Sequence, residues 1–382
     1  MATFMEPSNV KYQFVETIEP VEYYVPGGYH PVTLGDELCS GQYIIADKLG
    51  WGRYATTWLA KDTNEGRLLT KAEFNLPGKV VVQSLLDSFD ISGPNGTHRC
   101  SLIPLPASRA IAAQLVHGVQ FIHSRGIVHG DLHQSDILFR LPPSLENMTF
   151  EQLRAVTGEP INQPVVREDG VPLGPGVPSE LVMPLGFSLD SDKVTLKDAP
   201  LIIADFGKAF KPRDHKQYYF NTPLLLAPPE SRFANAGTLD EPLSFPSDIW
   251  TLACTVWDVF RQRPPFESFH IEENEVTMEQ VEMLGELPKR WWIEWKDRRN
   301  WFDEDGIKNV REDLKQLYWH KPRGWEIRFE EYIRKPRQRN KLEMFSADEE
   351  RDFRVMMNLM LVLEPGERAT IDQVVAGEWM QR

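Results

Sequence analysis

The chain has 382 residues, a formal net charge of −14 and three cysteines. The length is sufficient for two lobes or domains, and the acidic balance argues against direct binding of nucleic acid. Cys39, Cys100 and Cys254 form no C-x-x-C pair, so neither a disulfide framework nor a zinc site is indicated, and a reducing cytoplasmic or nuclear compartment fits. No signal segment or apolar run of roughly 18 residues is present, so we expect no membrane association.

The N-terminal part of the chain is predicted to be rich in strands. Residues 1–40 contain Pro, Gly and Tyr without a helical period and are expected to form an extended segment. Residues 42–62 predict two strands joined by a glycine-containing turn, and a third strand is expected over 67–73. Residues 41–103 are therefore expected to form a small strand-rich domain.

The remainder, residues 104–382, is predicted to be mainly helical. A first helix is expected from Pro106 to Gly126, because apolar residues recur at helical spacing between these two punctuating residues. The segment of about 140–200 holds nine prolines and is expected to be a partly irregular insert. Further helices are expected over 247–261, 275–286, 306–318, 348–362 and 370–380. The predicted fold class is α+β, with a small β-rich part and a large helical part.

Two short apolar runs end on an aspartate. GIVHGDLHQSDILF contains Asp131, and LIIADFGKAF contains Asp205. Carboxylates held at the ends of rigid elements suit phosphoryl transfer from ATP, in which one orients the hydroxyl and the other holds Mg²⁺. Upstream, Gly50 and Gly52 lie between two predicted strands, where a residue without Cβ lets backbone N–H groups approach phosphates closely. A plain hairpin turn is the alternative interpretation of these glycines.

Five segments together resemble the SR-protein kinase family, especially its fungal members. They are PGGYHPVTLGDEL, LGWGRYATTWLAKD, LLDSFDISGPNGTH, HGDLHQSDILF and SDIWTLACTVWDVF, and ERATIDQVVAGEWM resembles the C-terminal helix of kinases. The resemblance implies a bilobal protein-kinase-like fold with a shortened N-terminal lobe. It also implies ATP and Mg²⁺ as cofactors, basic Arg/Ser-rich proteins as substrates, and a monomer.

The resemblance implies a role for several residues. Asp131 would be the catalytic aspartate, Asp205 would bind Mg²⁺, and Gly50 and Gly52 would cover the phosphates. Glu230 would form a structural pair with Arg368. Asp248 would brace the catalytic loop from a long central helix, although an N-cap of that helix is an equally good interpretation.

Other positions depart from the family pattern. Asp136 stands where an asparagine is expected, and its carboxylate is a possible Mg²⁺ ligand. His133 replaces a lysine that contacts phosphate and is expected to be a nucleotide-binding residue, although a neutral imidazole would stabilise the transferring phosphate less than an ammonium would. Lys71 is the only plausible nucleotide-binding lysine, although it lies one residue out of register, which on a strand turns a side chain to the other face. The chain after Lys71 is too short for the helix that carries the lysine's usual glutamate partner. Gly130 replaces the arginine that reads a phosphorylated activation segment, so no phosphorylation switch is expected.

Three functions remain open at this stage. The first is an ATP-dependent Ser/Thr protein kinase. The second is a catalytically impaired pseudokinase or scaffold, which the short N-terminal lobe favours. The third is a small-molecule phosphotransferase, because HGDLH also resembles aminoglycoside and choline kinases. The motifs LAPPE, SDIW and ERAT argue against the third function, because small-molecule kinases lack that apparatus.

Three further sets of residues have a structural interpretation as well as a functional one. His117 and His123 are expected to be structural, and the tryptophans at 291, 292 and 295 are expected to pack in a core. The acidic stretch at 272–286 has helical spacing. It is either a docking site for Arg-rich substrates, as the family resemblance implies, or a solvated face.

Overall fold

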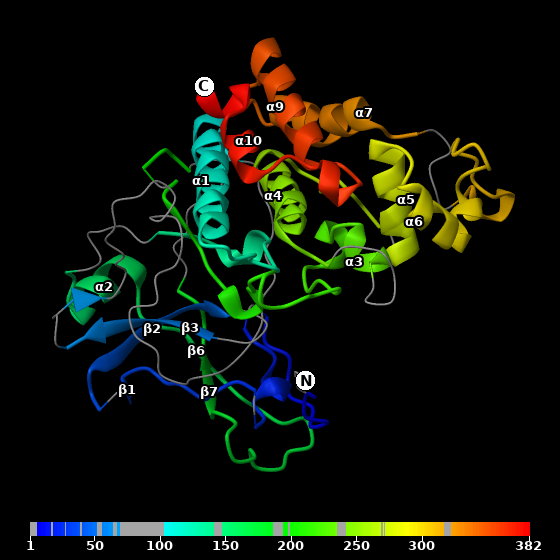
Figure 1. Ribbon diagram of the computed structural model, residues 1–382. Coiled ribbons are helices and arrows are strands. Elements are labelled where there is room, and N and C mark those ends of the chain that lie inside the picture. The colour runs from blue at the N-terminus through cyan, green and yellow to red at the C-terminus, as the bar shows by residue number, and fades with distance from the viewer. Residues whose placement is uncertain are drawn as a thin grey trace. The chain divides into compact units, whose positions relative to one another are not determined.

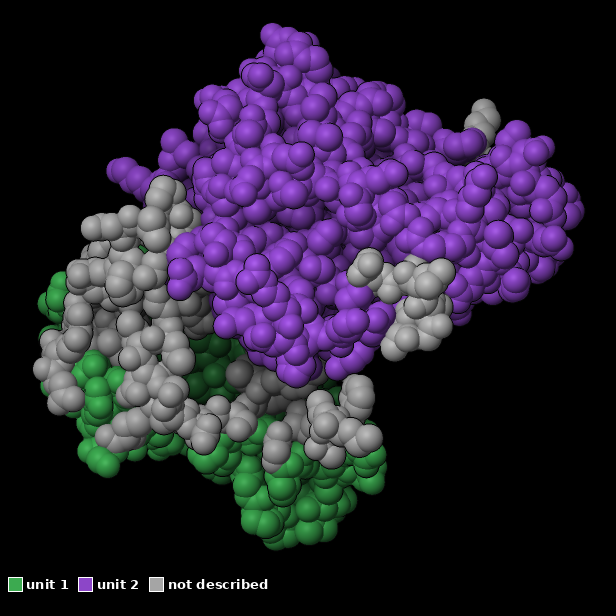
Figure 2. Space-filling view, viewed as in Figure 1, with its two compact units in different colours: residues 1–72, 84–99, 140–189 green, residues 73–83, 100–139, 190–382 purple. Residues whose placement is uncertain are grey.

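The structure is a computed structural model. It describes residues 6–16, 18–26, 28–38, 40–51, 56–63, 67–68, 103–140, 147–185, 194–197, 199–234, 242–268, 270, 272–316 and 322–382. The chain forms two compact units, coloured separately in Figure 2. Unit 1 comprises 1–72, 84–99 and 140–189, and unit 2 comprises 73–83, 100–139 and 190–382. The predicted α+β class is confirmed, since small sheets accompany a helical bulk. The segment 140–189 is assigned to unit 1 by its contacts, and the predicted domain boundaries stay a prediction.

Unit 1 is built around an antiparallel four-stranded sheet in the order β1-β2-β3-β4. The strands are β1 (Glu37–Leu38), β2 (Tyr43–Trp51), β3 (Thr56–Asp62) and β4 (Arg67–Leu68). β2 and β3 match the predicted pair, and β4 lies at the start of the predicted third strand. The rest of that prediction falls outside the described residues. The aromatic and β-branched residues of β2 and β3 favour the pleated conformation.

The insert of the sequence prediction contributes three elements to unit 1. Helix α2 (Phe150–Thr157) packs Leu153 against Ala46 and Leu59 of the sheet. Strands β6 (Asn162–Pro164) and β7 (Glu180–Val182) pair antiparallel and pack against tyrosines of the N-terminal segment, which carries one short 3-10 helix, η1 (Val21–Tyr23). Buried tyrosines therefore pack this part of the N-terminal segment against the β6–β7 region.

Unit 2 is organised around two long helices, α1 (Leu105–Ser124) and α4 (Phe245–Phe260), which lie side by side in Figure 1. α1 follows the prediction and buries the expected apolar stripe. α4 is buried on nearly all of its faces, as expected for a helix that is apolar all round. The shorter helices are α3 (Glu230–Phe233), α5 (Glu273–Leu284), α6 (Lys289–Glu294), α7 (Trp325–Phe329), α8 (Lys335–Arg339), α9 (Ala347–Met360) and α10 (Ile371–Val375), with a π-helical turn over Glu330–Arg334 between α7 and α8.

The 3-10 helices of unit 2 connect these elements. They are η3 (Gln134–Asp136), η6 (Phe206–Lys208), η7 (Leu224–Leu226), η8 (Lys296–Asn300), η9 (Glu312–Leu314), η11 (Pro365–Glu367) and η12 (Glu378–Gln381). Strands β5 (Ile137–Phe139) and β8 (Leu201–Ile203) form the two-stranded sheet of this unit.

The helix predicted over 306–318 is wrong for the part that the structure describes. Phe302 instead bridges Lys308, and only a 3-10 turn forms at Glu312–Leu314. The Asp303 side chain accepts hydrogen bonds from the backbone N–H groups of Asp305 (3.1 Å) and Ile307 (2.9 Å). Such local bonds offer the backbone an alternative to the helix.

Trp291, Trp292 and Trp295 are buried in the main core of unit 2, as predicted. Trp292 and Trp295 meet edge to face at 6.0 Å between ring centroids. None of the helices in the described part of the chain is both long enough and apolar enough to cross a membrane.

Candidate active site

The β5–β8 pair brings the two aspartate motifs to one end of a small sheet. Ile137 at the start of β5 lies opposite Ile203 at the end of β8. In an antiparallel pair the chain entering one strand lies beside the chain leaving the other. The backbone N–H of Ala204 donates to the carbonyl of Asp136 at 2.8 Å and extends the ladder towards Asp205. The register of this pair therefore decides that Asp131, Asp136 and Asp205 gather in one place.

His133 lies between two of these carboxylates. Its Nε2 is 3.8 Å from Oδ1 of Asp131, and its Nδ1 is 3.2 Å from Oδ2 of Asp136. The backbone N–H of His133 also donates to Oδ2 of Asp136 at 3.2 Å. The side chain of Asp136 is 6% exposed and that of Asp131 is 20% exposed. The site therefore combines a buried carboxyl group with a partly accessible one.

Burial and mutual repulsion shift the protonation of this group. Burial, with the nearby charges of Asp131 and Asp205, raises the pKa of Asp136 to about 9. Burial also raises the pKa of Asp131, to which Asp205 adds, while His133 opposes the shift. Burial lowers the pKa of His133. Carboxyl groups with raised pKa values, close enough to affect one another, are typical of functional sites.

Asp205 is held in an unusual backbone conformation. Its φ is 56°, in the left-handed region, and its Oδ1 accepts a hydrogen bond from the N–H of Gly207 at 3.2 Å. Aspartate tolerates this region better than most residues because its short side chain can bond locally. The side chain of Asp205 thereby caps the 3-10 turn Phe206–Lys208.

Gly130 is required by its position next to the chain that follows Asp205. Its φ is 78°, and a Cβ on it would lie 2.7 Å from the backbone carbonyl oxygen of Lys208. An arginine at this position would clash with that backbone. The absence of a phosphorylation switch stays a prediction. The contact with Lys208 gives a steric reason why position 130 is a glycine and not an arginine.

Two neighbouring residues tie the loops together and were not singled out from the sequence. The Nε2 of His129 donates to the carbonyl of Ala204 at 2.9 Å, and the side chain is fully buried. The Thr222 hydroxyl lies close enough to Asp131 to lower its pKa against the effect of burial. His129 could have been suspected because it stands at the end of the apolar run that precedes Asp131. Thr222 carries no such signal, because only the fold brings it to the loop.

Asp248 braces the loop, as predicted. Its carboxylate accepts hydrogen bonds from the backbone N–H groups of His129 (2.7 Å) and Gly130 (3.0 Å), and Oδ2 is 3.0 Å from Nε2 of His123. Burial alone would raise the pKa of Asp248, but these hydrogen bonds and the histidines lower it below its usual value. The structural assignment of His123 agrees with this contact.

The predicted pair of Glu230 and Arg368 is also present. Both guanidinium Nη atoms of Arg368 donate to the carboxylate, each at 2.6 Å. The side chains are 0% exposed for Arg368 and 4% exposed for Glu230. The Ser247 hydroxyl donates to Glu230 at 2.9 Å. This geometry is a buried bidentate ion pair, which fixes the segment ending at Glu230 to the C-terminal part of unit 2.

The other predicted site residues come from the N-terminal part of the chain. Gly50 lies in β2 of unit 1, opposite Thr57 of β3. Gly52 and Lys71 lie outside the described residues. Within unit 1, the buried Lys48 of β2 pairs with the buried Glu19. The roles assigned to Gly50, Gly52 and Lys71 stay predictions.

The residues present fit Mg²⁺ and a nucleotide by their chemistry. Asp131, Asp136 and Asp205 supply the hard oxygen ligands that Mg²⁺ prefers. Two of these carboxyl groups have raised pKa values, which a bound cation would relieve. Among the described residues, however, no group of three or more His, Cys, Asp or Glu side chains is already assembled around one metal position. Any metal would therefore need ligands beyond the protein, such as phosphate oxygens or water.

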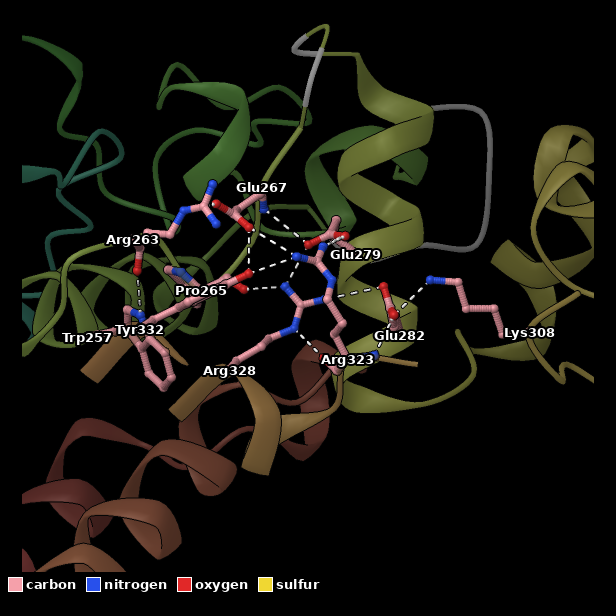
Figure 3. Close-up of polar contacts among 10 residues, drawn as sticks. All are labelled: Trp257, Arg263, Pro265, Glu267, Glu279, Glu282, Lys308, Arg323, Arg328 and Tyr332. Carbon is pink, nitrogen blue, oxygen red and sulfur yellow. Dashed lines mark hydrogen bonds and ion pairs between the residues drawn. The ribbon is translucent and has the colours of Figure 1, made fainter. Parts of the chain in front are cut away.

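The acidic stretch at 272–286, most of which forms α5, fits neither the docking site nor the solvated face expected from the sequence. Glu275 and Glu279 are buried, and the side chain of Glu282 is 0% exposed. Figure 3 shows that Glu279 and Glu282 face Arg323 and Arg328, with Lys308 reaching Glu282. Half of this stretch is neither a solvated face nor a free docking surface.

The glutamates of α5 and these basic side chains form close ion pairs in which the opposite charges neutralise one another. Arg328 Nη1 donates to Glu279 at 2.6 Å and to the carbonyl of Pro265 at 2.8 Å. Lys308 Nζ donates to Glu282 at 2.7 Å, and Arg323 also pairs with Glu279. Burial would raise the pKa of Glu279, but the two arginines lower it below its usual range. The sequence hides this because the two arginine partners of Glu279 lie more than 40 residues away along the chain.

Comparison with known proteins found relatives among protein kinases. A serine/threonine-protein kinase SRPK of Physarum polycephalum is 26% identical over 349 residues, which cover 77% of this chain and 78% of that protein. The human SRSF protein kinase 3 is 29% identical over 168 residues, and the protein kinase dsk1 of Schizosaccharomyces pombe is 32% identical over 166 residues. These two matches span 30% of the human protein and 30% of the yeast protein. No protein-family model matches the chain.

Proposed function

The chain is related to the SR-protein kinases, and from this premise we propose that it is an ATP-dependent serine/threonine protein kinase that acts on basic, Arg/Ser-rich proteins. The observation that carries the proposal is the gathering of Asp131, Asp136 and Asp205 at one end of the β5–β8 pair. The names of the relatives support the reaction class and the kind of substrate.

In the proposed mechanism Asp131 orients the hydroxyl of the substrate serine or threonine and accepts its proton. A pKa raised by burial brings this carboxyl nearer to the operating pH, which favours a general base. Bound Mg·ATP would supply the phosphoryl group and the metal charge that stabilises its transfer. Asp205 and Asp136 would hold the metal, and Gly50 and Gly52 would cover the phosphates.

His133 and Asp248 would position the catalytic carboxyl group. Asp248 accepts hydrogen bonds from the backbone N–H groups of the two residues before Asp131, and these bonds fix the loop to α4. His133, largely neutral because burial lowers its pKa, separates Asp131 from Asp136 without adding a cation. Lys71 would contact phosphate in this proposal.

A catalytically impaired pseudokinase is the second candidate. It is favoured by the raised pKa of Asp136, which leaves that carboxyl group protonated at neutral pH and a poorer metal ligand. A scaffold of this kind would keep the Asp248 and Glu230 anchors, because these stabilise the helical unit rather than the reaction.

Titration calorimetry with Mg·ATP, followed by transfer of labelled phosphate to an Arg/Ser peptide, tests the proposal. Asp131→Asn is expected to abolish transfer while nucleotide binding remains, and Asp205→Asn is expected to weaken the binding of Mg·ATP. Asp305→Asn, at an exposed position elsewhere in unit 2, is the matched control and is expected to keep both. If Mg·ATP gives no heat of binding and no peptide is labelled, the scaffold function is favoured over the kinase function. Labelling of choline or an aminoglycoside instead would indicate a small-molecule phosphotransferase.

A further inference from the structure

A turn that follows Asp205 carries three exposed cations: Lys211, Arg213 and Lys216. We call these three residues the cationic turn. The backbone is folded back on itself here, since the N–H groups of Asp214 and His215 both donate to the carbonyl of Lys211, at 2.9 and 3.0 Å. Asp214 is the one acidic residue within the turn. Three positive side chains are thus presented to solvent from a short, internally bonded segment.

The cations of this turn have no partner within the part of the chain that the structure describes. No ion pair or side-chain hydrogen bond involves Lys211, Arg213 or Lys216 there. Many arginines elsewhere in unit 2 are engaged by carboxylates, for example Arg109, Arg261, Arg290, Arg311, Arg328, Arg334, Arg351 and Arg368. In a chain with a net charge of −14, the cationic turn gathers three unpaired cations within residues 211–216.

The turn is fixed to the candidate active site. Phe210, immediately before Lys211, exchanges two backbone hydrogen bonds with Val128, at 2.8 and 3.0 Å. The Phe210 side chain is buried against Val128 and Leu243. On the other side, the N–H of Leu243 donates to the carbonyl of Gln217 at 2.7 Å. Since Val128 lies three residues before Asp131, the cationic turn is anchored to the loop that would carry the reaction.

We propose that the cationic turn docks an acidic segment of the protein substrate beside the site of phosphoryl transfer. The inference rests on the proposed function for the nature of the partner, and it adds an anionic element to a substrate otherwise expected to be basic. The acidic carboxylates of α5 that were expected to receive arginines are largely paired internally. At about 0.1 M salt, charges more than about 10 Å away are largely screened, so the local cations outweigh the net negative charge of the chain at contact.

The occupant of the cationic turn is a segment of aspartate or glutamate carboxylates, which accept hydrogen bonds from lysine and arginine, and a phosphoserine segment is the alternative that the test distinguishes. Binding is measured by fluorescence anisotropy, without nucleotide, for three labelled peptides of equal length. One carries glutamates, one carries phosphoserines at the same positions, and one carries lysines. We expect the two anionic peptides to bind more tightly than the lysine peptide, and the tighter of the two identifies the source of the anion.

The triple variant Lys211→Glu, Arg213→Glu and Lys216→Glu is expected to weaken anionic peptide binding by about tenfold, because three exposed pairs at about 0.5 kcal/mol each sum to about 1.5 kcal/mol. The matched control carries Lys289→Glu, Lys296→Glu and Lys341→Glu, three exposed lysines elsewhere in unit 2. It makes the same change of net charge and is expected to bind nearly as the unaltered protein does. Equal weakening in both triple variants, or no preference for the anionic peptides, would overturn the proposal.

Two further measurements distinguish a local docking site from a general effect of charge. A variant with glutamine at positions 211, 213 and 216 removes the cations without adding negative charge. It is expected to weaken binding of the anionic peptides less than the triple glutamate variant does. Carbodiimide cross-linking of the glutamate peptide, followed by mass spectrometry, is expected to attach it at Lys211 or Lys216, and cross-links confined to other lysines would refute the docking site. Peptide binding that depends on the turn in a protein without kinase activity would refute the proposed function and leave the docking site intact.

Discussion

The buried pair of Glu230 and Arg368 permits a quantitative prediction about the stability of unit 2. Arg368→Met removes both charge-assisted hydrogen bonds to Glu230 and leaves the carboxylate buried with the Ser247 hydroxyl. Leaving one partner of a buried pair uncompensated costs about 3–5 kcal/mol. We therefore expect the free energy of unfolding to fall by about that amount. Urea denaturation followed by tryptophan fluorescence is a suitable assay, since Arg368 lies 5.0 Å from the ring of Trp250.

Arg290 provides a matched control for this experiment. It also forms a two-point pair with a glutamate, Glu364, at 2.6 and 2.9 Å, and it also lies over a tryptophan ring. That pair is 46% and 31% exposed, however, so Arg290→Met is expected to cost no more than about 1 kcal/mol. The double variant Glu230→Leu with Arg368→Met is expected to recover part of the loss, because no charge remains buried alone. If Arg368→Met costs no more than Arg290→Met, the reasoning from burial is wrong.

Three other predictions concern the loop around Asp131. Asp248→Asn is expected to lower the free energy of unfolding by about 3 kcal/mol, because the backbone N–H groups lose a charged acceptor; an unchanged urea midpoint would contradict this. Gly130→Ala is expected to cost about 2 kcal/mol or more from the positive φ and the contact with the carbonyl of Lys208, measured against Gly324→Ala, where a Cβ meets nothing within 4 Å. For Asp136 the folded pKa of about 9 lies above the ordinary 3.8, so the unfolded chain releases a proton that the folded protein keeps. Its contribution to stability is full below about pH 4 and is lost as the pH rises towards 9, by about 1.4 kcal/mol per pH unit. In the presence of EDTA, Asp136→Asn should flatten that decline between about pH 6 and pH 8, and an equal slope in both proteins would refute the assignment.

The sequence alone determined most of the local structure of the helical unit. The 3.6-residue spacing of Ile111 and Leu115 predicted α1, and the apolar run after Asp248 predicted α4. The pairing of Glu230 with Arg368 followed from the resemblance to kinases and is present. The two helices were predictable because each depends on a periodic pattern contained in one segment. The pair, which joins two remote segments, was predictable only through the family resemblance. The helix expected at 306–318 failed because side-chain bonds from Asp303 compete locally with helix formation.

The tertiary structure decided the electrostatics, which depend on partners remote in sequence. From the sequence, the α5 glutamates form an acidic face. In the structure, Arg323 and Arg328 pack against Glu279 and neutralise its charge. The raised pKa of Asp136 likewise requires burial and the approach of Asp205, which the β5–β8 register supplies. A sequence states how many charges a segment carries. Their free energies depend on desolvation and on distances of a few ångströms, which are fixed only when distant segments pack together.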